Sequence, residues 1–183
     1  SRLLILCAGG MLGHKLCQGV AHDHEAVALV RRPPDFYQRF PEAFAGVERF
    51  LQADVLEPGA LERALDDARP DVVLNAVGIV KQLDEAKNRY LSVAVNAMLP
   101  HELARLAASR GARVVHFSTD CVFSGERGSY TEADDSGARD LYGKSKFLGE
   151  TDEGEANAIT LRSSIIGREL TLPSTGLMEW FLA

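Results

Sequence analysis

The sequence predicts an α/β fold in which a parallel sheet carries helices on both faces. Short apolar runs alternate with segments of helical periodicity along almost the whole chain. Continuous apolar strands are typical of a parallel sheet that is covered on both sides. The first apolar run leads directly into a glycine turn, and a helical segment follows it. That order favours a doubly wound, Rossmann-type nucleotide-binding sheet over a closed barrel.

Strands and helices are expected to alternate in the following order. Strands are predicted at 3–7, 26–30, 49–52, 71–78, 112–118 and 158–164. Helices are predicted at 11–21, 58–68, 85–110 and 141–150, where apolar residues recur at helical spacing. The segment 124–139 is polar and rich in turn residues, which predicts a long loop of the kind that often has a function.

Length and charge restrict the classes of function. A chain of 183 residues fits one domain with a real core, and its net charge of -6 argues against nucleic acid or an anionic membrane as the main partner. No stretch is long and apolar enough to span a bilayer. The three cysteines lack metal-ligand spacing, which fits reduced thiols in a cytoplasmic protein. His22 and His24 are interpreted as surface-loop residues, so no metal site is predicted.

The chain is expected to divide near residue 166. Residues 1–166 contain all the predicted strands and form the expected NAD(P)-binding domain. Residues 167–183 stop just after an apolar segment begins, and we expect them to be the start of an incomplete substrate-binding region. Most of the part that would complete the substrate pocket is therefore expected to be missing.

The first candidate site is the turn in LLILCAGGMLGHKL, residues 3–16. Gly10 and Gly13 keep the spacing of the last two glycines in a G-x-x-G-x-x-G turn, whereas Cys7 stands at the position of the first. Such a turn brings backbone N–H groups and the positive end of a helix dipole to a pyrophosphate. The alternative is an ordinary strand-to-helix turn without a ligand.

Two arginines follow the second strand. Dinucleotide-binding proteins that prefer NAD usually carry an acidic residue here for the ribose 2′-hydroxyl. Arg31 and Arg32 instead favour a 2′-phosphate, because a guanidinium group matches phosphate geometry. The alternative is a solvated basic pair before two prolines.

Tyr142 and Lys146 form the most specific pair, since residues four apart on a helix share a face. A nearby ammonium is expected to lower the pKa of the phenol from about 10, which makes it a usable proton donor to a carbonyl oxygen. Ser118 and Thr119 lie at the carboxyl end of a predicted strand, where ligands bind in open α/β sheets. The alternatives are a solvated surface lysine and simple capping of a strand end.

Together these segments resemble the extended short-chain dehydrogenase/reductase superfamily. The glycine turn, NAVG (75–78), STDCVFSG (118–125), YTEAD (130–134) and YGKSKFLGE (142–150) resemble, more narrowly, the dTDP-4-dehydrorhamnose reductase family. The segments GMLGHKL, GIVKQL and LRSSIIGRE resemble a branch that acts on bacterial surface-polysaccharide sugars. The likeness spans nearly the whole chain. Cys7 and Cys121 depart from the family pattern, which has glycine and often tyrosine at these positions.

The resemblance implies roles for individual residues. Tyr142 would donate a proton, Lys146 would hold the nicotinamide ribose, and Thr119 would bind the substrate carbonyl with Ser118 close by. Other residues would bind further parts of the cofactor. Gly10, Met11, Leu12 and Gly13 would hold the pyrophosphate, Arg31 the 2′-phosphate, and Asp54 and Val55 would lie beside the adenine. Ala76, Val77 and Gly78 would line the cofactor cleft, which Asn96 would help to anchor. Asp120 and Lys81 would lie near the substrate.

The implied activity is an NADPH-dependent reduction of a 4-keto sugar nucleotide, with NADH as the alternative cofactor. The product would serve the synthesis of bacterial surface polysaccharides, and the resemblance also allows a homodimer. Two other functions remain open on this scaffold. One is a non-catalytic nucleotide-binding regulatory subunit, which Cys7 favours, and the other is a sugar-nucleotide epimerase.

Overall fold

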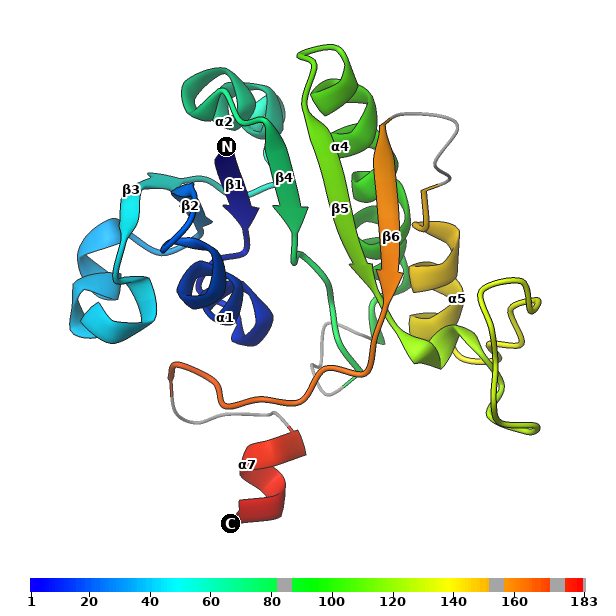
Figure 1. The fold of residues 1–183 in the computed structure, drawn as a ribbon. Coiled ribbons are helices and arrows are strands. Elements are labelled where there is room, and N and C mark those ends of the chain that lie inside the picture. Colours follow the sequence, from blue (N-terminus) through cyan, green and yellow to red (C-terminus); the bar gives the residue numbers. More distant parts are fainter. Residues whose placement is uncertain (82–86, 152–156, 172–176, 183) are drawn as a thin grey trace.

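Six parallel strands form the centre of the molecule (Figure 1). This computed structural model describes residues 1–81, 87–151, 157–171 and 177–182. The strand order is β3-β2-β1-β4-β5-β6, which confirms the predicted doubly wound sheet. The strands are β1 (Arg2–Leu6), β2 (Glu25–Val30), β3 (Val47–Gln52), β4 (Val72–Asn75), β5 (Arg113–Ser118) and β6 (Ala158–Arg162).

Alternate side chains of the strands enter two separate cores, one on each face of the sheet. Leu4 and Leu6 of β1 pack with the helices α2 (Ala60–Ala68) and α4 (Leu99–Ala108). Leu3 and Ile5 point the other way. They pack in a cluster with residues of α1 (Met11–Val20) and of two 3₁₀ helices, η1 (Pro34–Arg39) and η2 (Pro41–Phe44). Both faces are therefore covered, as the apolar strands predicted.

The predicted helix 85–110 is interrupted. It consists of α3 (Arg89–Ser92), a π-helical turn η4 (Val93–Met98) and α4, while residues 85 and 86 lie outside the described part of the chain. The Asn88 side chain caps the start by accepting a hydrogen bond from the N–H of Leu91 at 3.1 Å. Pro100 has no N–H group, so the carbonyl of Asn96 has no α-helical donor. A π-turn at this point accommodates that missing hydrogen bond.

Other boundaries move by a few residues. The strand predicted at 71–78 ends at Asn75, where its ladder with the neighbouring strands stops. The helix predicted at 141–150 is α5 (Leu141–Leu148), which ends before Gly149. The two 3₁₀ helices η1 and η2 were not expected, although each begins with a proline, as helices often do. Residues 124–139 form the predicted loop.

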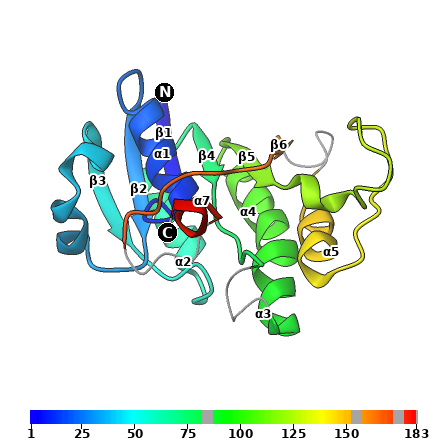
Figure 2. The ribbon, with the colours of Figure 1, turned by 90° about the horizontal axis from the view of Figure 1, so that it is seen from below.

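Figure 2 looks onto the carboxyl ends of the strands, the edge where the glycine turn follows β1 and Thr119 follows β5. The chain that leaves β6 crosses this edge toward α1 and reaches α7 (Leu177–Leu182). Gly167 lies against Met11, because a Cβ added to it would be 3.0 Å from the Met11 sulfur. The domain boundary at residue 166 stays a prediction, and part of 167–183 (172–176 and 183) is outside the described residues.

Candidate functional site at the carboxyl edge of the sheet

The glycine turn joins β1 to α1. Cys7 has a φ of +56°, in the left-handed region that favours glycine, and its side chain is exposed. Its carbonyl accepts a hydrogen bond from the N–H of Gly10 at 2.9 Å. Cys7 thus adopts the backbone shape that the usual glycine would have, so the turn forms despite the substitution.

Gly13 lets α1 approach the turn closely. A Cβ at this position would lie 2.1 Å from the Cys7 carbonyl oxygen and 2.7 Å from Cα of Ala8. Gly10 caps α1 without a side-chain hydrogen bond, and the first turn of the helix has no acidic residue. The N–H groups of Met11, Leu12 and Gly13 belong to this first turn, where helical N–H groups lack helical partners and suit an anion.

The predicted adenosine contacts lie after β2 and β3. Arg31 is exposed, and its carbonyl accepts a hydrogen bond from the side chain of Gln52 at 3.4 Å. Arg32 stacks its guanidinium over the ring of Phe36 at 4.4 Å. Asp54 accepts a hydrogen bond from the N–H of Leu56 at 3.0 Å, which shapes the turn after β3. Arg31 is therefore the more available of the two cations.

Tyr142 lies on the first turn of α5, beside Thr119. The helix is capped by Asp140, whose side chain accepts a hydrogen bond from the N–H of Gly143 at 2.8 Å. Gly143 lets α5 approach the β5 end, because an added Cβ would lie 2.3 Å from the Cys121 carbonyl oxygen. Close packing of α5 thus brings Tyr142 to the strand end that carries Thr119.

The prediction that Lys146 lowers the pKa of the Tyr142 phenol is wrong. Burial raises the pKa of Tyr142, and this outweighs a hydrogen bond with Thr119 and the charge of Lys81, which both lower it. The cation over the Tyr142 ring is Lys81, whose Nζ is 5.6 Å from the ring centre. Lys81 also pairs with Asp140 at 2.7 Å. Tyr142 therefore holds its proton at neutral pH and can act as a proton donor.

Lys146 is buried and turned toward β5. Its Nζ donates a hydrogen bond to the Phe117 carbonyl at 2.7 Å and lies 3.4 Å from Nε2 of His116. Burial lowers the pKa of Lys146 to about 8, although the nearby Glu150 carboxylate opposes the shift. Gly78 lies beside it, since an added Cβ would be 3.8 Å from Nζ. Lys146 thus reaches from α5 to the chain that follows β4.

Asn96 fixes the cleft from the π-turn η4. Its Oδ1 accepts from the N–H of Ile79 at 2.9 Å, and its Nδ2 donates to the Ile79 carbonyl at 3.1 Å and to Ser145 Oγ at 3.2 Å. Ala76 and Val77 lead from the end of β4 into this contact, and the N–H of Val77 donates to Asn75 Oδ1 at 3.1 Å. The structure therefore brings 76–78, Asn96 and Lys146 together.

Ser118 does not face the same space as Thr119. Its hydroxyl donates to Glu150 Oε1 at 2.7 Å, and Arg162 makes a bidentate pair with the same carboxylate. Asp120 is held by the Ser164 hydroxyl, and this hydrogen bond is the main reason that its pKa is lowered. Ser118 thus has a structural partner away from Tyr142. The Thr119 hydroxyl lies beside Tyr142, where it also donates to Asp120 Oδ1 at 3.2 Å and accepts from the N–H of Cys121 at 3.1 Å.

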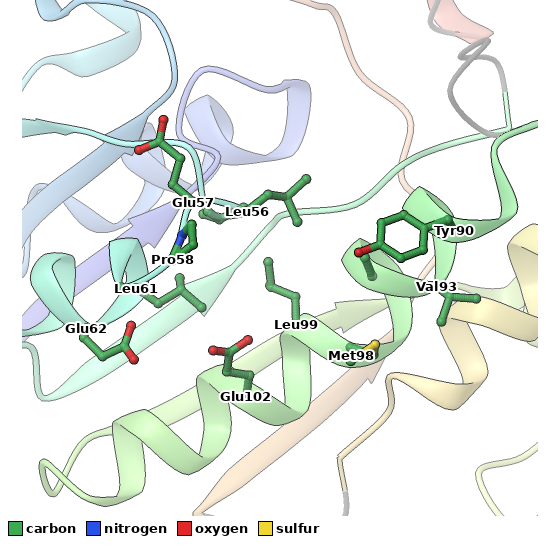
Figure 3. A pocket seen from close by; sticks show the side chains of 13 residues that line it. Leu56, Glu57, Pro58, Leu61, Glu62, Tyr90, Val93, Met98, Leu99 and Glu102 are labelled. Atoms are coloured by element: carbon green, nitrogen blue, oxygen red, sulfur yellow. The ribbon is translucent and has the colours of Figure 1, made fainter.

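Two cavities flank these residues. One, of about 370 Å³, lies between the chain that follows β3 and the helices α3 and α4; Val55 lines it, with Leu61, Tyr90 and Leu99 around it (Figure 3). The other, of about 750 Å³, is lined by Lys81, Asp120, Cys121 and residues of the long loop. The predicted substrate residues Lys81 and Asp120 therefore share a cavity on the Tyr142 side.

Two kinds of feature are absent from the described part of the chain. None of its helices has the length and apolar character needed to cross a bilayer. Within the same residues, His, Cys, Asp and Glu side chains form no group of three that could hold a metal ion.

Sequence reasoning missed three polar residues around Lys146: Asn75 and His116, which are buried, and Glu150, which is half-buried. Asn75 and His116 are fully buried and hydrogen-bonded to each other. Both belong to segments that the sequence analysis used, NAVG and HFSTD. Because their neighbours are apolar, they were counted only as strand residues. A polar side chain within an otherwise apolar central strand was the available signal.

Comparison with known proteins shows the family of this chain. The model of the RmlD substrate binding domain family matches residues 1–167. A dTDP-4-dehydrorhamnose reductase of Mycobacterium tuberculosis is 32% identical over 155 residues, which cover 81% of this chain and 44% of that protein. A probable dTDP-4,6-dihydroxy-2-methyloxan-3-one 4-ketoreductase of Streptomyces antibioticus is also 32% identical, over 81% of this chain and 45% of that protein.

Solved structures show the same fold. A hypothetical dTDP-4-dehydrorhamnose reductase from Sulfolobus tokodaii superposes with a TM-score of 0.76 at 28% identity, over 92% of this chain and 57% of the other. A dTDP-4-dehydrorhamnose reductase from Bacillus anthracis, in complex with NADP, gives 0.68 at 23% identity, over 88% and 52%. The chain spans about half the length of the curated relatives it matches. By its sequence and its sheet, the chain belongs to the RmlD substrate binding domain family of extended short-chain dehydrogenase/reductases.

Proposed function

We propose that the protein containing this chain is an NADPH-dependent reductase of a 4-keto sugar nucleotide. The observation that carries the proposal is that Tyr142 lies beside Thr119 after β5 and Lys146 binds the Phe117 carbonyl of the same strand, at the carboxyl edge that also carries the glycine turn after β1. The sugar-nucleotide class comes from the relatives, two of which are a dTDP-4-dehydrorhamnose reductase and a probable 4-ketoreductase.

The residues of the edge fit a dinucleotide cofactor. Gly13 keeps α1 close to the turn, and the uncapped first turn of α1 offers N–H groups to a pyrophosphate. Arg31 would pair with a 2′-phosphate, which favours NADPH over NADH. Asp54 and Val55 would lie beside the adenine, and residues 76–78 with Asn96 would line the cleft to the nicotinamide.

The proposed chemistry assigns each residue one task. NADPH, when bound, supplies a hydride to the keto carbon. Thr119 would donate a hydrogen bond to the carbonyl oxygen, and Tyr142 would deliver the proton that the developing alkoxide needs. The Tyr142 hydroxyl carries its proton at neutral pH, as a donor must, although its raised pKa makes it a weaker acid than a free tyrosine. Lys146 would hold the ribose of the nicotinamide with its Nζ, and Lys81 and Asp120 would contact the sugar nucleotide.

The pair Tyr142→Phe and Tyr90→Phe tests the proposal in the full-length protein. The Tyr90 side chain is 83% exposed, so removing its hydroxyl changes no buried contact. We expect Tyr142→Phe to bind NADPH normally but to lose most turnover with dTDP-4-keto sugars, while Tyr90→Phe keeps both. Near-normal turnover of Tyr142→Phe would contradict the assignment. Binding of NADPH by wild type without turnover of any keto sugar would favour a regulatory subunit.

We further propose that the full-length protein is a homodimer in a reducing compartment. Tyr90, Met98 and Leu148 expose apolar side chains on α3, η4 and α5, which fits a homodimer through these helices. Light scattering of the full-length protein would show the dimer mass. The free cysteines Cys7, Cys17 and Cys121 suit a reducing compartment such as the cytoplasm.

A further inference from the structure

A buried polar row connects the centre of the sheet to Lys146. Asn75 at the end of β4 and His116 in β5 are fully buried, and Lys146 of α5 is 4% exposed. Asn75 Nδ2 lies 3.0 Å from His116 Nδ1, and His116 Nε2 lies 3.4 Å from Lys146 Nζ. The proposed mechanism uses only the last member of this row.

The backbone decides which way the Asn75 amide points. The N–H of Val77 can only donate, and it lies 3.1 Å from Oδ1 of Asn75. The amide nitrogen must therefore face His116, and it can only donate as well. Nδ1 of His116 accepts that hydrogen bond, so in the neutral ring the proton is on Nε2. His116 stays neutral, because burial lowers its pKa to about 3, with the charges of Lys146 and His101 acting in the same direction.

The proton on Nε2 affects Lys146. A protonated Nε2 faces Nζ, and an ammonium group also has only donors. Two donors that face each other repel, whereas the lone pair of a neutral amine accepts from Nε2–H. The same Nζ donates to the Phe117 carbonyl at 2.7 Å in either state. The row is therefore fully satisfied only when Lys146 is neutral.

We propose that Asn75 and His116 are positioning residues for Lys146: Asn75 holds the His116 proton on Nε2, and this N–H group disfavours the charged form of Lys146. The importance of the row for catalysis rests on the proposed function, in which Lys146 holds the cofactor. Burial acts in the same direction, and the Glu150 carboxylate at the end of α5 acts against it.

The wild-type chain gives the first test, through long-range proton–nitrogen NMR correlations of its five histidines. We expect the His116 signal to show an unprotonated Nδ1 and a protonated Nε2 at neutral pH. The signal is assigned by its loss in His116→Gln. A proton on Nδ1 would overturn the proposal. This measurement requires neither cofactor nor turnover, so its result is separate from that of the Tyr142→Phe experiment.

Two variants of similar size test the effect on Lys146. In Asn75→Asp, the carboxylate accepts from both Val77 N–H and His116 Nδ1–H, so the ring proton moves and Nε2 accepts from the ammonium. Asn75→Leu removes the amide donor without adding a charge. The pKa of Lys146 is read from the Cε carbon signal, which is assigned by its loss in Lys146→Met.

We expect the pKa of Lys146 to rise in both variants, by about one pH unit or more in Asn75→Asp and by less in Asn75→Leu. The proton of His116 moves to Nδ1 in Asn75→Asp. A rise in Asn75→Asp alone, with Asn75→Leu unchanged, would mean that only the added negative charge acts, and the proposal would fail. If neither variant folds, the wild-type spectrum still decides whether Asn75 holds the proton on Nε2.

Discussion

Replacing Gly13 with alanine should destabilise the glycine turn and weaken cofactor binding together. The added Cβ would lie 2.1 Å from the Cys7 carbonyl oxygen and 2.7 Å from Cα of Ala8. Both atoms belong to the backbone, so neither can rotate away, and α1 must move from the turn. Overpacking of this kind costs about 1–3 kcal/mol, and the shift also misplaces the N–H groups that would hold the pyrophosphate.

Gly19 in the same helix provides the matched control. A Cβ added to Gly19 meets nothing within 4 Å, so Gly19→Ala should stabilise the helix by roughly 0.5–1 kcal/mol. The two variants should therefore differ by about 1.5–4 kcal/mol in the free energy of unfolding. For a chain of this size the difference corresponds to roughly 3–16 °C in Tm.

The assay is urea unfolding of both variants, followed by calorimetric titration with NADPH. We expect Gly13→Ala to unfold at lower urea than wild type and to bind NADPH at least tenfold more weakly. Gly19→Ala should unfold at the same or higher urea and bind normally. Equal stability and equal NADPH affinity of the two variants would refute the close contact between α1 and the turn.

Three further predictions concern the same edge. Cys7→Gly removes a left-handed cysteine, which should raise the free energy of unfolding by up to about 1 kcal/mol and leave NADPH binding at least as tight; weaker binding in titration would contradict this. Arg31→Ala should lower NADPH affinity about tenfold and leave NADH affinity unchanged, whereas Arg32→Ala, which removes a cation stacked on Phe36, should affect both cofactors equally. Tighter binding of NADH than NADPH by wild type would refute the role of Arg31. The third prediction concerns pH. Burial lowers the pKa of Lys146 to about 8 in the folded chain, whereas a lysine of the unfolded chain has a pKa near 10.4. Between pH 8 and about 10 the unfolded chain therefore binds one more proton than the folded chain. The stability of wild type relative to Lys146→Met should therefore rise with pH by up to ~3 kcal/mol across this window in urea unfolding, and a flat difference would contradict the buried charge.

Local pattern was enough to predict the sheet and its turns. The apolar strands, the glycine turn and the helical periodicity of α2 depend on neighbouring residues, and the structure confirms all three. The interruption at η4 was less visible, because Pro100 affects a carbonyl four residues earlier inside an otherwise helical pattern. The 3₁₀ helices η1 and η2 were also missed. Their aromatic side chains pack on Phe50 of β3, a contact between separate segments that local pattern does not show.

The site residues were found by type, but their partners were not. Tyr142 and Lys146 share a helix, yet Lys146 binds the Phe117 carbonyl, and the cation over the Tyr142 ring is Lys81. Ser118 and Thr119 are adjacent, but alternation along the chain sends the Ser118 hydroxyl to Glu150. Contacts of this kind join segments that are about thirty or more residues apart in the sequence, so only the folded structure shows them.

The most direct test is NADPH consumption by the full-length protein with dTDP-4-dehydrorhamnose, followed by absorbance of the reduced cofactor and by chromatography of the sugar nucleotide. The proposed site predicts that NADPH is oxidised in equal amount to the reduced sugar formed, and that Tyr142→Phe abolishes both signals while it still binds NADPH. Binding of NADPH without oxidation by any 4-keto sugar nucleotide would contradict the proposed reductase activity.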